Sequence, residues 1–596
     1  MNESAFPKRT VLTEIKSVLP IGTIDPKSLK IYNTVMDSPA GAWDLAPDFP
    51  PNLFAVVGHL CQISGAMGYY VPNPHDQEQN GTFVLSVKDK EELEKTANDW
   101  NSDAKNPTGT IDRLWADLLK MGNHDVRMEG SNTPQWWPVA MKLLIIADSA
   151  SKGLGRHVSA SNGEGASRFN MFIATFFDNN EGQKKEAESF RDQSLRKPAS
   201  VTTLVDMDVV CVLPKSRIAQ VGCTLRNLTA NLALLPPRGM VRCHWTQSRE
   251  EPKPDNHSAL DILLVPLPYK IFGRNFHEKH QKSSITGKSV QNMPNWASFQ
   301  INQGWLEDKE EKLVDFVMDL LKEASKEVET INGIIFPEFS LNYNIFEKLC
   351  DRLVSKDYGV EFIVAGSSTN CKPEEGGANF VVTAVRRQLA KPKNTDDQNY
   401  GFAITSRRKH HRWKLDQIQV SEYALASSLN PTTSAWWEDH HIAKRELYFH
   451  QFRQSSTFVS MICEDLARND PCHEIIRSIG PNLLFALLMD GPQLKNRWSA
   501  RYASSLADDP GCSVLTLTSF GLVDRLNSTK KYEENRSIAL WKDETGQMIE
   551  IPMPKGGADC GVLISLCSKD VFDQTIDGRK TMNCSWRFQS QLPIEL

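Results

Sequence analysis

The sequence has little net charge, no long hydrophobic run and no closely spaced cysteines. Its 68 Lys and Arg residues stand against 73 Asp and Glu residues, which leaves a net charge of −5 over 596 residues. Such a balance provides no broad basic field that would attract nucleic acid or an anionic membrane. The charge therefore argues against a nucleic-acid partner.

Long apolar segments are also missing. The longest apolar runs, 143–147, 262–267 and 483–489, fall far short of the ~20 residues that cross a bilayer. The N-terminal segment MNESAFPKRTVLTEIKS has no apolar core of the kind found in secretory signals. We therefore expect no membrane association and a cytoplasmic location.

The cysteine pattern excludes two small-domain architectures. The 12 cysteines include no C-x-x-C pair, and the closest two are Cys560 and Cys567. This spacing argues against a disulfide framework and against a structural zinc ribbon. In a reducing compartment, a free thiol then remains available for chemistry.

Nucleotide-binding motifs are absent as well. The short glycine pairs at 153–155 and 163–165 do not form G-x-G-x-x-G, and no Walker A sequence occurs. Asp206-Met207-Asp208 resembles a polymerase metal pair but has no second carboxylate pair on a later hairpin. Two-metal chemistry needs that second pair, so nucleotidyl transfer is not supported.

A polar, proline-containing segment divides the chain. Residues 248–258 (SREEPKPDNHS) read as a linker between an N-terminal domain, 1–250, and a second domain, 258–596. The first domain shows an α+β pattern of unknown type, with a helix expected at 138–152 and a strand at 201–212. We expect it to recognise a protein partner or to gate the second domain.

The downstream half alternates apolar strands with amphipathic helices. This alternation is typical of an α/β domain in which helices cover a sheet. The expected helices are 306–328 and 344–356, and the expected strands are 260–267, 331–336, 362–366, 380–385, 402–415, 458–463, 483–489, 514–518 and 562–566.

Cys463 is the first candidate for chemistry, because it ends an apolar strand. A sharp strand-to-helix turn there would present its thiol at the rim of the sheet and aim the Glu464 N–H at a developing oxyanion. Taken alone, a cysteine in this position is more often an ordinary core residue.

Three charged residues are the candidate partners of this thiol. Glu338 follows a buried strand, where burial would raise its pKa and suit it to take a proton. Lys414 would lower the pKa of the thiol and neutralise an oxyanion, and Glu422 follows it eight residues later. The alternatives are a charge at a helix N-terminus for Glu338 and a solvated surface position for Lys414.

The order Glu, Lys, Glu, Cys on an α/β domain resembles the carbon–nitrogen hydrolase, or nitrilase, superfamily. Residues 414–423 (KLDQIQVSEY) are similar to its pattern K-x-H-L-x-P-x-G-E-Y. Segments 484–491, 497–506 and 514–521 resemble three further motifs of the family. The likeness covers roughly residues 258–570.

The resemblance implies a C-terminal α-β-β-α sandwich, a thioester on the cysteine and an amide or nitrile as the small-molecule substrate. It implies no metal and no cofactor, and it suggests a homo-oligomer. The implied site consists of catalytic Glu338, Lys414, Cys463 and Glu422, with Glu464, Met489 and Asp490 beside the substrate.

Some positions depart from the family pattern. Asp416 replaces the usual His, Ser421 replaces the Gly, and Met489-Asp490 stands where Asn-Asp is common. A second hypothesis therefore stays open: a nitrilase-like domain used for assembly or sensing with little turnover, by analogy in bacterial anti-phage defence. The segment 422–463, rich in Trp and His, is expected to be a lid or an oligomer contact rather than a metal site.

Overall fold

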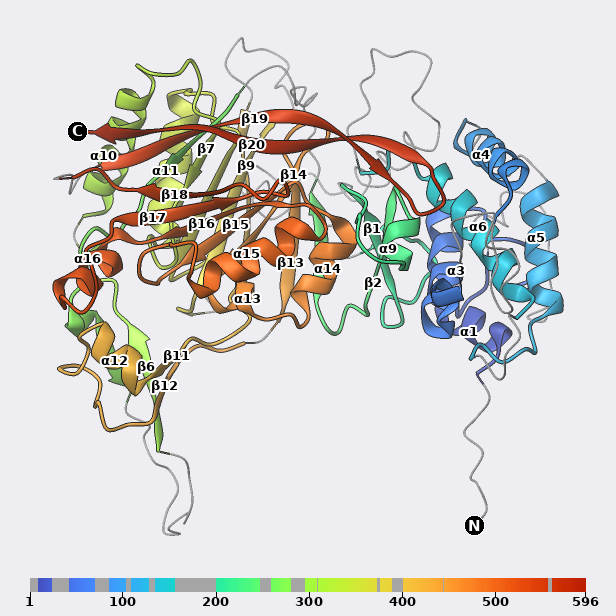
Figure 1. Cartoon of the computed structure of the whole chain (residues 1–596), viewed down its shortest axis with the longest axis horizontal. Helices are drawn as coiled ribbons and strands as arrows, with labels where there is room; N and C mark the ends of the chain where they lie inside the picture. Colours follow the sequence, from blue (N-terminus) through green and yellow to red (C-terminus); the bar gives the residue numbers. More distant parts are fainter. Residues whose placement is uncertain are drawn as a thin grey trace.

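The fold is a mixed α/β arrangement with several sheets, in agreement with the expected class (Figure 1). The computed structural model describes residues 9–23, 42–69, 85–102, 109–127, 134–155, 200–246, 259–279, 295–307, 309–371, 376–388, 400–442, 444–555 and 560–596. The expected linker at 248–258 and the glycine pair at 163–165 lie outside these residues. Among the described residues, no helix combines the length and the apolar character needed to span a bilayer.

The N-terminal part is built around one apolar helix, α6, which contacts α3, α4 and α5. The helix expected at 138–152 is confirmed in α6, and the adjacent Trp136 and Trp137 are fully buried core residues. Because α6 is apolar on nearly every side, it lies inside the group rather than at its surface. The helices are α1 (Val11–Val18), α3 (Pro50–Ser64), α4 (Val87–Ser102), α5 (Gly109–Lys120) and α6 (Trp136–Ala150).

A short two-stranded sheet follows these helices. The strand expected at 201–212 is wrong over most of its length, because only β1, at its end, is extended and paired. Residues 200–210 instead form turns in which Asn52 on α3 receives the Thr203 N–H. The elements are β1 (Cys211–Pro214), α9 (Leu225–Leu228) and β2 (Leu232–Leu235).

Two seven-stranded sheets form the rest of the core. We call them sheet A and sheet B. Sheet A has the order β10 (Tyr400–Arg408), β9 (Phe380–Gln388), β8 (Phe362–Ser367), β7 (Gly333–Ile335), β4 (Leu260–Leu264), β19 (Cys560–Gln574), β20 (Lys580–Glu595). Sheet B has the order β18 (Met548–Pro552), β17 (Ser537–Lys542), β16 (Ser513–Thr518), β15 (Leu483–Leu488), β14 (Thr457–Ile462), β13 (Glu446–Gln451), β3 (Arg242–Thr246).

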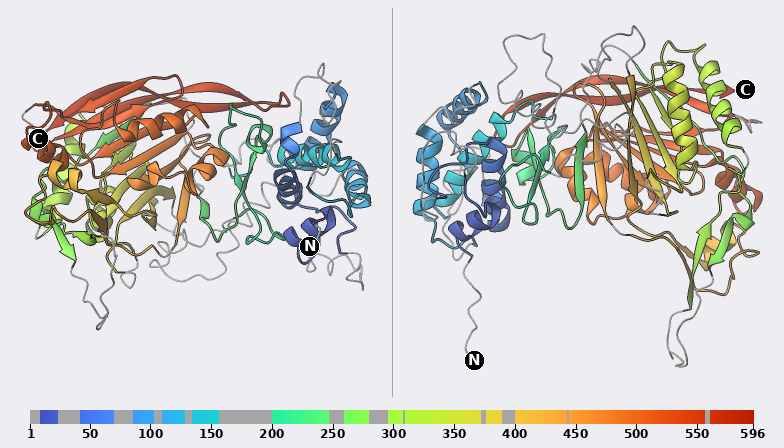
Figure 2. Two further views of the ribbon diagram at one scale, coloured as in Figure 1. Left: turned by 60° about the horizontal axis from the view of Figure 1, so that its bottom comes forward. Right: turned by 180° about the vertical axis from the view of Figure 1, so that it is seen from behind.

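The two sheets contact each other, and helices cover their other faces. Strand β9 contacts β14, β10 contacts β13, and β20 contacts β16. Helices α10 and α11 pack against sheet A (Figure 2, right), and α13 and α15 pack against sheet B. The bounds are α10 (Glu310–Ala324), α11 (Tyr343–Ser355), α13 (Glu464–Ala467), α14 (Cys472–Ile479), α15 (Trp498–Asp508) and α16 (Phe520–Ser528).

The halves expected on either side of the linker share structure. Strand β3 precedes the linker in sequence, yet it pairs in parallel with β13 at the edge of sheet B. In the other direction, the long β19–β20 hairpin extends from sheet A toward the N-terminal helices (Figure 1).

A smaller four-stranded sheet lies beside the two large ones and packs on an apolar cluster that includes Phe339, Trp413 and Met489. Since Phe339 and Met489 follow strands of sheets A and B, this cluster joins all three sheets near their strand ends. Its order is β11 (Lys414–Asp416), β12 (Ala435–Glu438), β6 (Trp296–Ile301), β5 (Phe276–Lys279).

Candidate active site

Cys463 lies on a strained turn between β14 and α13. Its backbone has φ 41° and ψ −108°, a region that non-glycine residues seldom adopt. The Leu487 carbonyl accepts its N–H at 2.9 Å, and its own carbonyl accepts the Leu466 N–H at 2.9 Å. Strain of this kind persists where the surroundings impose it, and it gathers at functional sites.

Glu338 lies just beyond β7 and is completely buried. Gly366 on β8 allows this position, because a Cβ there would lie 2.4 Å from the Glu338 Cα. The Gly366 N–H also donates to the Pro337 carbonyl at 3.1 Å. The carboxylate is therefore held by the adjacent parallel strand as well as by its own.

Two further charged residues are buried against Glu338. The Lys409 Nζ, just after β10, donates to Glu338 Oε1 at 2.8 Å and to Glu438 Oε2 at 2.7 Å. Asn379 Nδ2 donates to Glu338 Oε1 at 2.7 Å and to Glu438 Oε1 at 2.8 Å. The backbone carbonyl of Asn379 accepts the Lys409 backbone N–H at 2.8 Å. This one asparagine therefore bonds to all three charged residues of the cluster.

The charges in this cluster determine its protonation. Burial raises the pKa of Glu338, and Glu438 adds to this, against the opposing effect of Lys409. Burial would also raise the pKa of Glu438, but Lys409 and His440 outweigh it and hold that pKa below its usual value. Burial alone would lower the pKa of Lys409, yet the two carboxylates keep it well above normal.

Cys463 belongs to the same electrostatic unit. Burial raises the pKa of its thiol well above the usual value, and Glu338 raises it further, whereas Lys409 lowers it. The resting side chain is therefore a neutral thiol on which the charges of Glu338 and Lys409 act. It needs a base before it can act as a nucleophile.

The loop that carries Lys409 is bound to the turn that carries Cys463. Asp465, two residues after the cysteine and fully buried, accepts the backbone N–H groups of His410 at 2.9 Å and His411 at 3.0 Å. Its other oxygen accepts Arg407 Nη1 at 3.1 Å. Strand β10 of sheet A and strand β14 of sheet B therefore present their functional residues to each other.

Lys414 and Glu422 do not join this cluster. Lys414 is an exposed residue of β11, and its ammonium lies 5.6 Å from the centre of the Trp437 ring. Glu422 ends the short helix α12 (Gln417–Glu422), where it accepts the Tyr532 hydroxyl at 2.6 Å in an exposed hydrogen bond. The structure places Lys409 and Glu438 beside Glu338 instead.

One sequence signal distinguishes the two lysines. The family pattern K-x-H fits Lys409-His410-His411, whereas Lys414 is followed two positions later by Asp416. No comparable signal marks Glu438, which reaches the cluster from the end of β12. Its place depends on the parallel pairing of β12 with β6.

The three residues expected beside the substrate lie around the cysteine turn. Glu464 begins α13, and its half-buried side chain pairs with Arg468 at 3.1 Å. Met489 is fully buried in the apolar cluster between the sheets. Asp490 follows β15, and its charge acts on the Cys463 thiol.

Three side chains of the protein donate hydrogen bonds to the Asp490 carboxylate. Its Oδ1 accepts the Tyr423 hydroxyl at 2.6 Å and Arg497 Nη2 at 2.7 Å, and its Oδ2 accepts Trp498 Nε1 at 2.9 Å. Asp490 thus links α15 and the Tyr423 side chain to the end of β15.

The Trp- and His-rich segment between Glu422 and Cys463, expected to be a lid or an oligomer contact, contributes β12 to the four-stranded sheet and β13 and β14 to sheet B. His450 on β13 lies between two threonines. His440 is buried, and within the described part of the chain neither ring nitrogen has a hydrogen bond, although Nδ1 lies 3.9 Å from Glu438 Oε1. Across the residues that the structure describes, no three His, Cys, Asp or Glu side chains gather to hold a metal ion.

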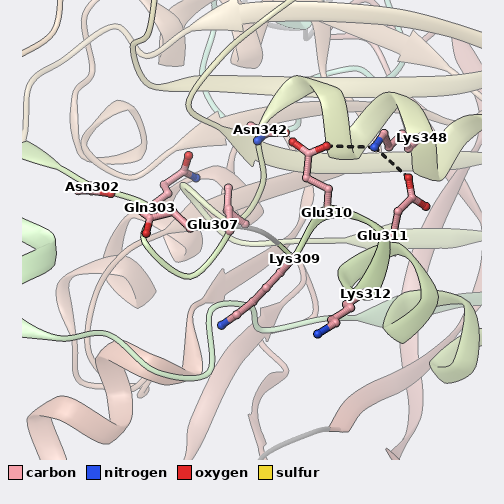
Figure 3. A pocket seen from close by; sticks show the side chains of 10 residues that line it. Asn302, Gln303, Glu307, Lys309, Glu310, Glu311, Lys312, Asn342 and Lys348 are labelled. Carbon is pink, nitrogen blue, oxygen red and sulfur yellow. Dashed lines mark hydrogen bonds and ion pairs between the residues drawn. The ribbon is translucent and has the colours of Figure 1, made fainter.

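A surface hollow of about 670 Å³ lies at the start of α10 (Figure 3). It is lined by charged side chains, with Lys348 between Glu310 and Glu311. Gln303, at its edge, donates to the Phe339 and Leu341 carbonyls and so contacts the segment after Glu338. The hollow thus borders that segment, but neither Glu338 nor Cys463 lines it.

No protein-family model and no curated protein matches the sequence. Comparison with solved structures gives a different result. The chain is similar to carbon–nitrogen hydrolases. These include Nit3 of Saccharomyces cerevisiae, a member of branch 10 of the nitrilase superfamily, at 9% identity over 58% of this chain and 93% of that one, with a TM-score of 0.27. A carbon–nitrogen hydrolase from Helicobacter pylori matches at 9% identity over 55% and 89%, with a TM-score of 0.26.

A third similar structure is a larger protein. The glutamine-dependent NAD+ synthetase of Acinetobacter baumannii matches at 11% identity over 52% of this chain, with a TM-score of 0.27, and the match spans only 45% of that protein.

Proposed function

We propose that the chain is a thiol-dependent hydrolase of non-peptide carbon–nitrogen bonds, with Cys463 as its nucleophile. The observation that carries this proposal is the buried Glu338–Lys409–Glu438 cluster, in which the charges of Glu338 and Lys409 act on a thiol held on a strained turn. Burying three charged groups has a desolvation cost, and perturbed charged clusters of this kind are typical of functional sites. In this proposal the large sheets and their helices form the α-β-β-α sandwich.

In the first step, Glu338 takes the proton of Cys463 and the thiolate attacks the carbon of an amide. A C–S bond forms, and the electron pair of the C=O bond moves to oxygen. The Lys409 ammonium and the N–H of Glu464 stabilise this oxyanion. Glu338 then gives its proton to the nitrogen, the C–N bond breaks, and ammonia or an amine leaves a thioester.

In the second step, water releases the acid. Glu338 removes a proton from the water as it attacks the thioester carbon, and the proton passes to the departing thiolate. Glu438 stays ionised and holds Lys409 in place. The roles expected for Lys414 and Glu422 thus pass to Lys409 and Glu438.

The proposal is tested by an ammonia-release screen over amides and nitriles, with intact-mass detection of a covalent adduct. We expect release and an adduct on Cys463 in the full chain, and neither in Cys463→Ala. Cys512→Ala is the matched control, because Cys512 is also a fully buried free thiol with a pKa above its usual value. Turnover that survives in Cys463→Ala would overturn the proposal.

A further inference from the structure

Among the described residues, two buried hydrogen-bond acceptors in this cluster have no donor. Glu338 Oε2 and Asn379 Oδ1 are both buried, and within the described residues neither has a hydrogen-bond partner. The residues are 0% and 1% exposed, so bulk water does not satisfy them. They belong to side chains that are hydrogen-bonded to each other, which places both acceptors in one site.

The identity of the free Asn379 atom is fixed by chemistry. Its other terminal atom lies 2.7 Å from a Glu338 oxygen and 2.8 Å from a Glu438 oxygen. Only an NH₂ group can donate to two carboxylates, so the nitrogen must be there and the unpartnered atom must be the oxygen.

The free Glu338 oxygen is fixed in the same way. Lys409 and Asn379 both donate to Oε1, which leaves Oε2 as the oxygen without a donor. Proton transfer at this carboxylate therefore takes place at Oε2. Glu338 Oε2 and Asn379 Oδ1 can therefore each accept a hydrogen bond from an N–H or O–H donor of a ligand.

Buried acceptors without donors destabilise the protein unless a ligand supplies the donors. A primary carboxamide carries two N–H groups on one nitrogen, and the ammonia formed from it carries three. A nitrile carries none, and an N,N-dialkyl amide carries none either. The need for donors therefore discriminates among carbon–nitrogen substrates.

We propose that Glu338 Oε2 and Asn379 Oδ1 form a subsite for an –NH₂ group, which makes primary amides the preferred substrates over nitriles and tertiary amides. This inference rests on the proposed function, since it concerns the leaving nitrogen of the same reaction. Asn379 then has two roles: its NH₂ holds the two carboxylates, and its oxygen receives the substrate.

The test uses three alkylating probes on the full chain: 2-chloroacetamide, chloroacetonitrile and 2-chloro-N,N-dimethylacetamide. In each case the Cys463 sulfur forms a C–S bond, chloride leaves, and the thiol proton passes to Glu338. Each rate constant is divided by that of the same probe with glutathione. We expect 2-chloroacetamide to exceed both other probes by at least about 10-fold.

Probe size does not explain such a result, because the nitrile is smaller than the amide and the dimethylamide is larger. Equal normalised rates, or a preference for the nitrile, would overturn the inference while Cys463 still reacts rapidly. If Cys463 reacts no faster than Cys512 with any of the probes, the proposed function itself fails.

A variant tests the acceptor directly. In Glu338→Gln the side-chain oxygen must face Lys409 and Asn379, so an NH₂ group replaces Oε2. All rates fall because the base is lost, and we expect the ratio of amide to nitrile to fall to near 1. Ser460→Ala is the control. Ser460 Oγ is also buried and has no hydrogen-bond partner among the residues described, but it lines a separate cavity of about 10 Å³ between the sheets. Its ratio should stay at the value of the unmodified chain.

Discussion

At the scale of single residues, the site depends on two carboxylates in unequal surroundings. Glu438 accepts hydrogen bonds from the Lys409 ammonium, the Asn379 side-chain NH₂ and the Trp413 backbone N–H. Its pKa is held below the usual value despite burial. Within the part of the chain that the structure describes, Glu338 accepts hydrogen bonds on Oε1 alone, and burial raises its pKa. Carboxylates with divergent pKa values divide their roles: one stays charged and the other exchanges protons.

This difference predicts a pH dependence. Because Glu338 must be ionised to act as a base and its pKa is raised by burial, activity should be lost as pH falls while still above the usual carboxyl pKa of 4.5. The rate of Cys463 alkylation as a function of pH measures this acid limb. In Glu438→Gln the limb should move to lower pH, because the charge of Glu438 raises the Glu338 pKa. An acid limb at or below 4.5 in the unmodified chain would contradict this assignment.

At the scale of elements, the site depends on how the end of β10 is joined to the turn after β14. Asp465 makes this junction, and its pKa is lowered despite burial because His410, His411 and Arg407 surround it. The charge of Asp465 therefore stabilises the fold at pH values above the pKa that Asp465 has in the unfolded chain. That stability is lost as pH falls toward the lower pKa of the folded state.

Replacing this carboxylate tests the junction. Asp465→Asn should lower the free energy of unfolding by about 3–5 kcal/mol, because it leaves the buried Arg407 without its partner charge. It should also slow Cys463 alkylation, since the loop that carries Lys409 is released. Urea unfolding at several pH values should show a smaller loss of stability on acidification in the variant. Asp508→Asn, on an exposed position at the end of α15, is the control.

The same elements show which parts of the fold and the site could be predicted from the sequence. The strand expected at 483–489 and the helix at 344–356 match β15 and α11, because local apolar periodicity determines both. The positions of Glu338 and Cys463 after strands could be predicted from the same pattern. Lys409 was missed because residues 402–415 read as one strand. The chain actually turns after Arg408, where bonds to Asp465, more than fifty residues later, hold the turn.

At the scale of the whole molecule, the C-terminal hairpin joins the sheets to the N-terminal helices (Figure 1). Near its tip, the largely buried side chain of Arg579 donates to Asp148 Oδ2 on α6 at 2.9 Å and to the Leu228 carbonyl. Asp148 also accepts the N–H of Ala230, which precedes β2, and the N–H of Leu232, the first residue of β2. One ion pair thus connects a helix, the small two-stranded sheet and the hairpin.

Removing this ion pair should weaken the connection between the two halves. Arg579→Ala leaves Asp148 buried without its cation, which we expect to cost about 3–5 kcal/mol. In calorimetry the helical part should then unfold at a lower temperature than the sheets. Lys580→Ala, on the exposed neighbouring position, should leave the profile unchanged. A single unshifted transition in Arg579→Ala would show that the hairpin does not couple the halves.

In the proposed mechanism Lys409, rather than Lys414, is the cation that acts on Cys463. The most direct measurement is the rate constant for alkylation of Cys463 by 2-chloroacetamide in Lys409→Ala and Lys414→Ala. A cation in contact with the cluster shifts a pKa by about 1–3 units, so Lys409→Ala should slow alkylation at least about 10-fold. Lys414→Ala should leave the rate within about twofold, because its ammonium lies on the surface over Trp437. Slow alkylation in Lys414→Ala together with an unchanged rate in Lys409→Ala would contradict the account.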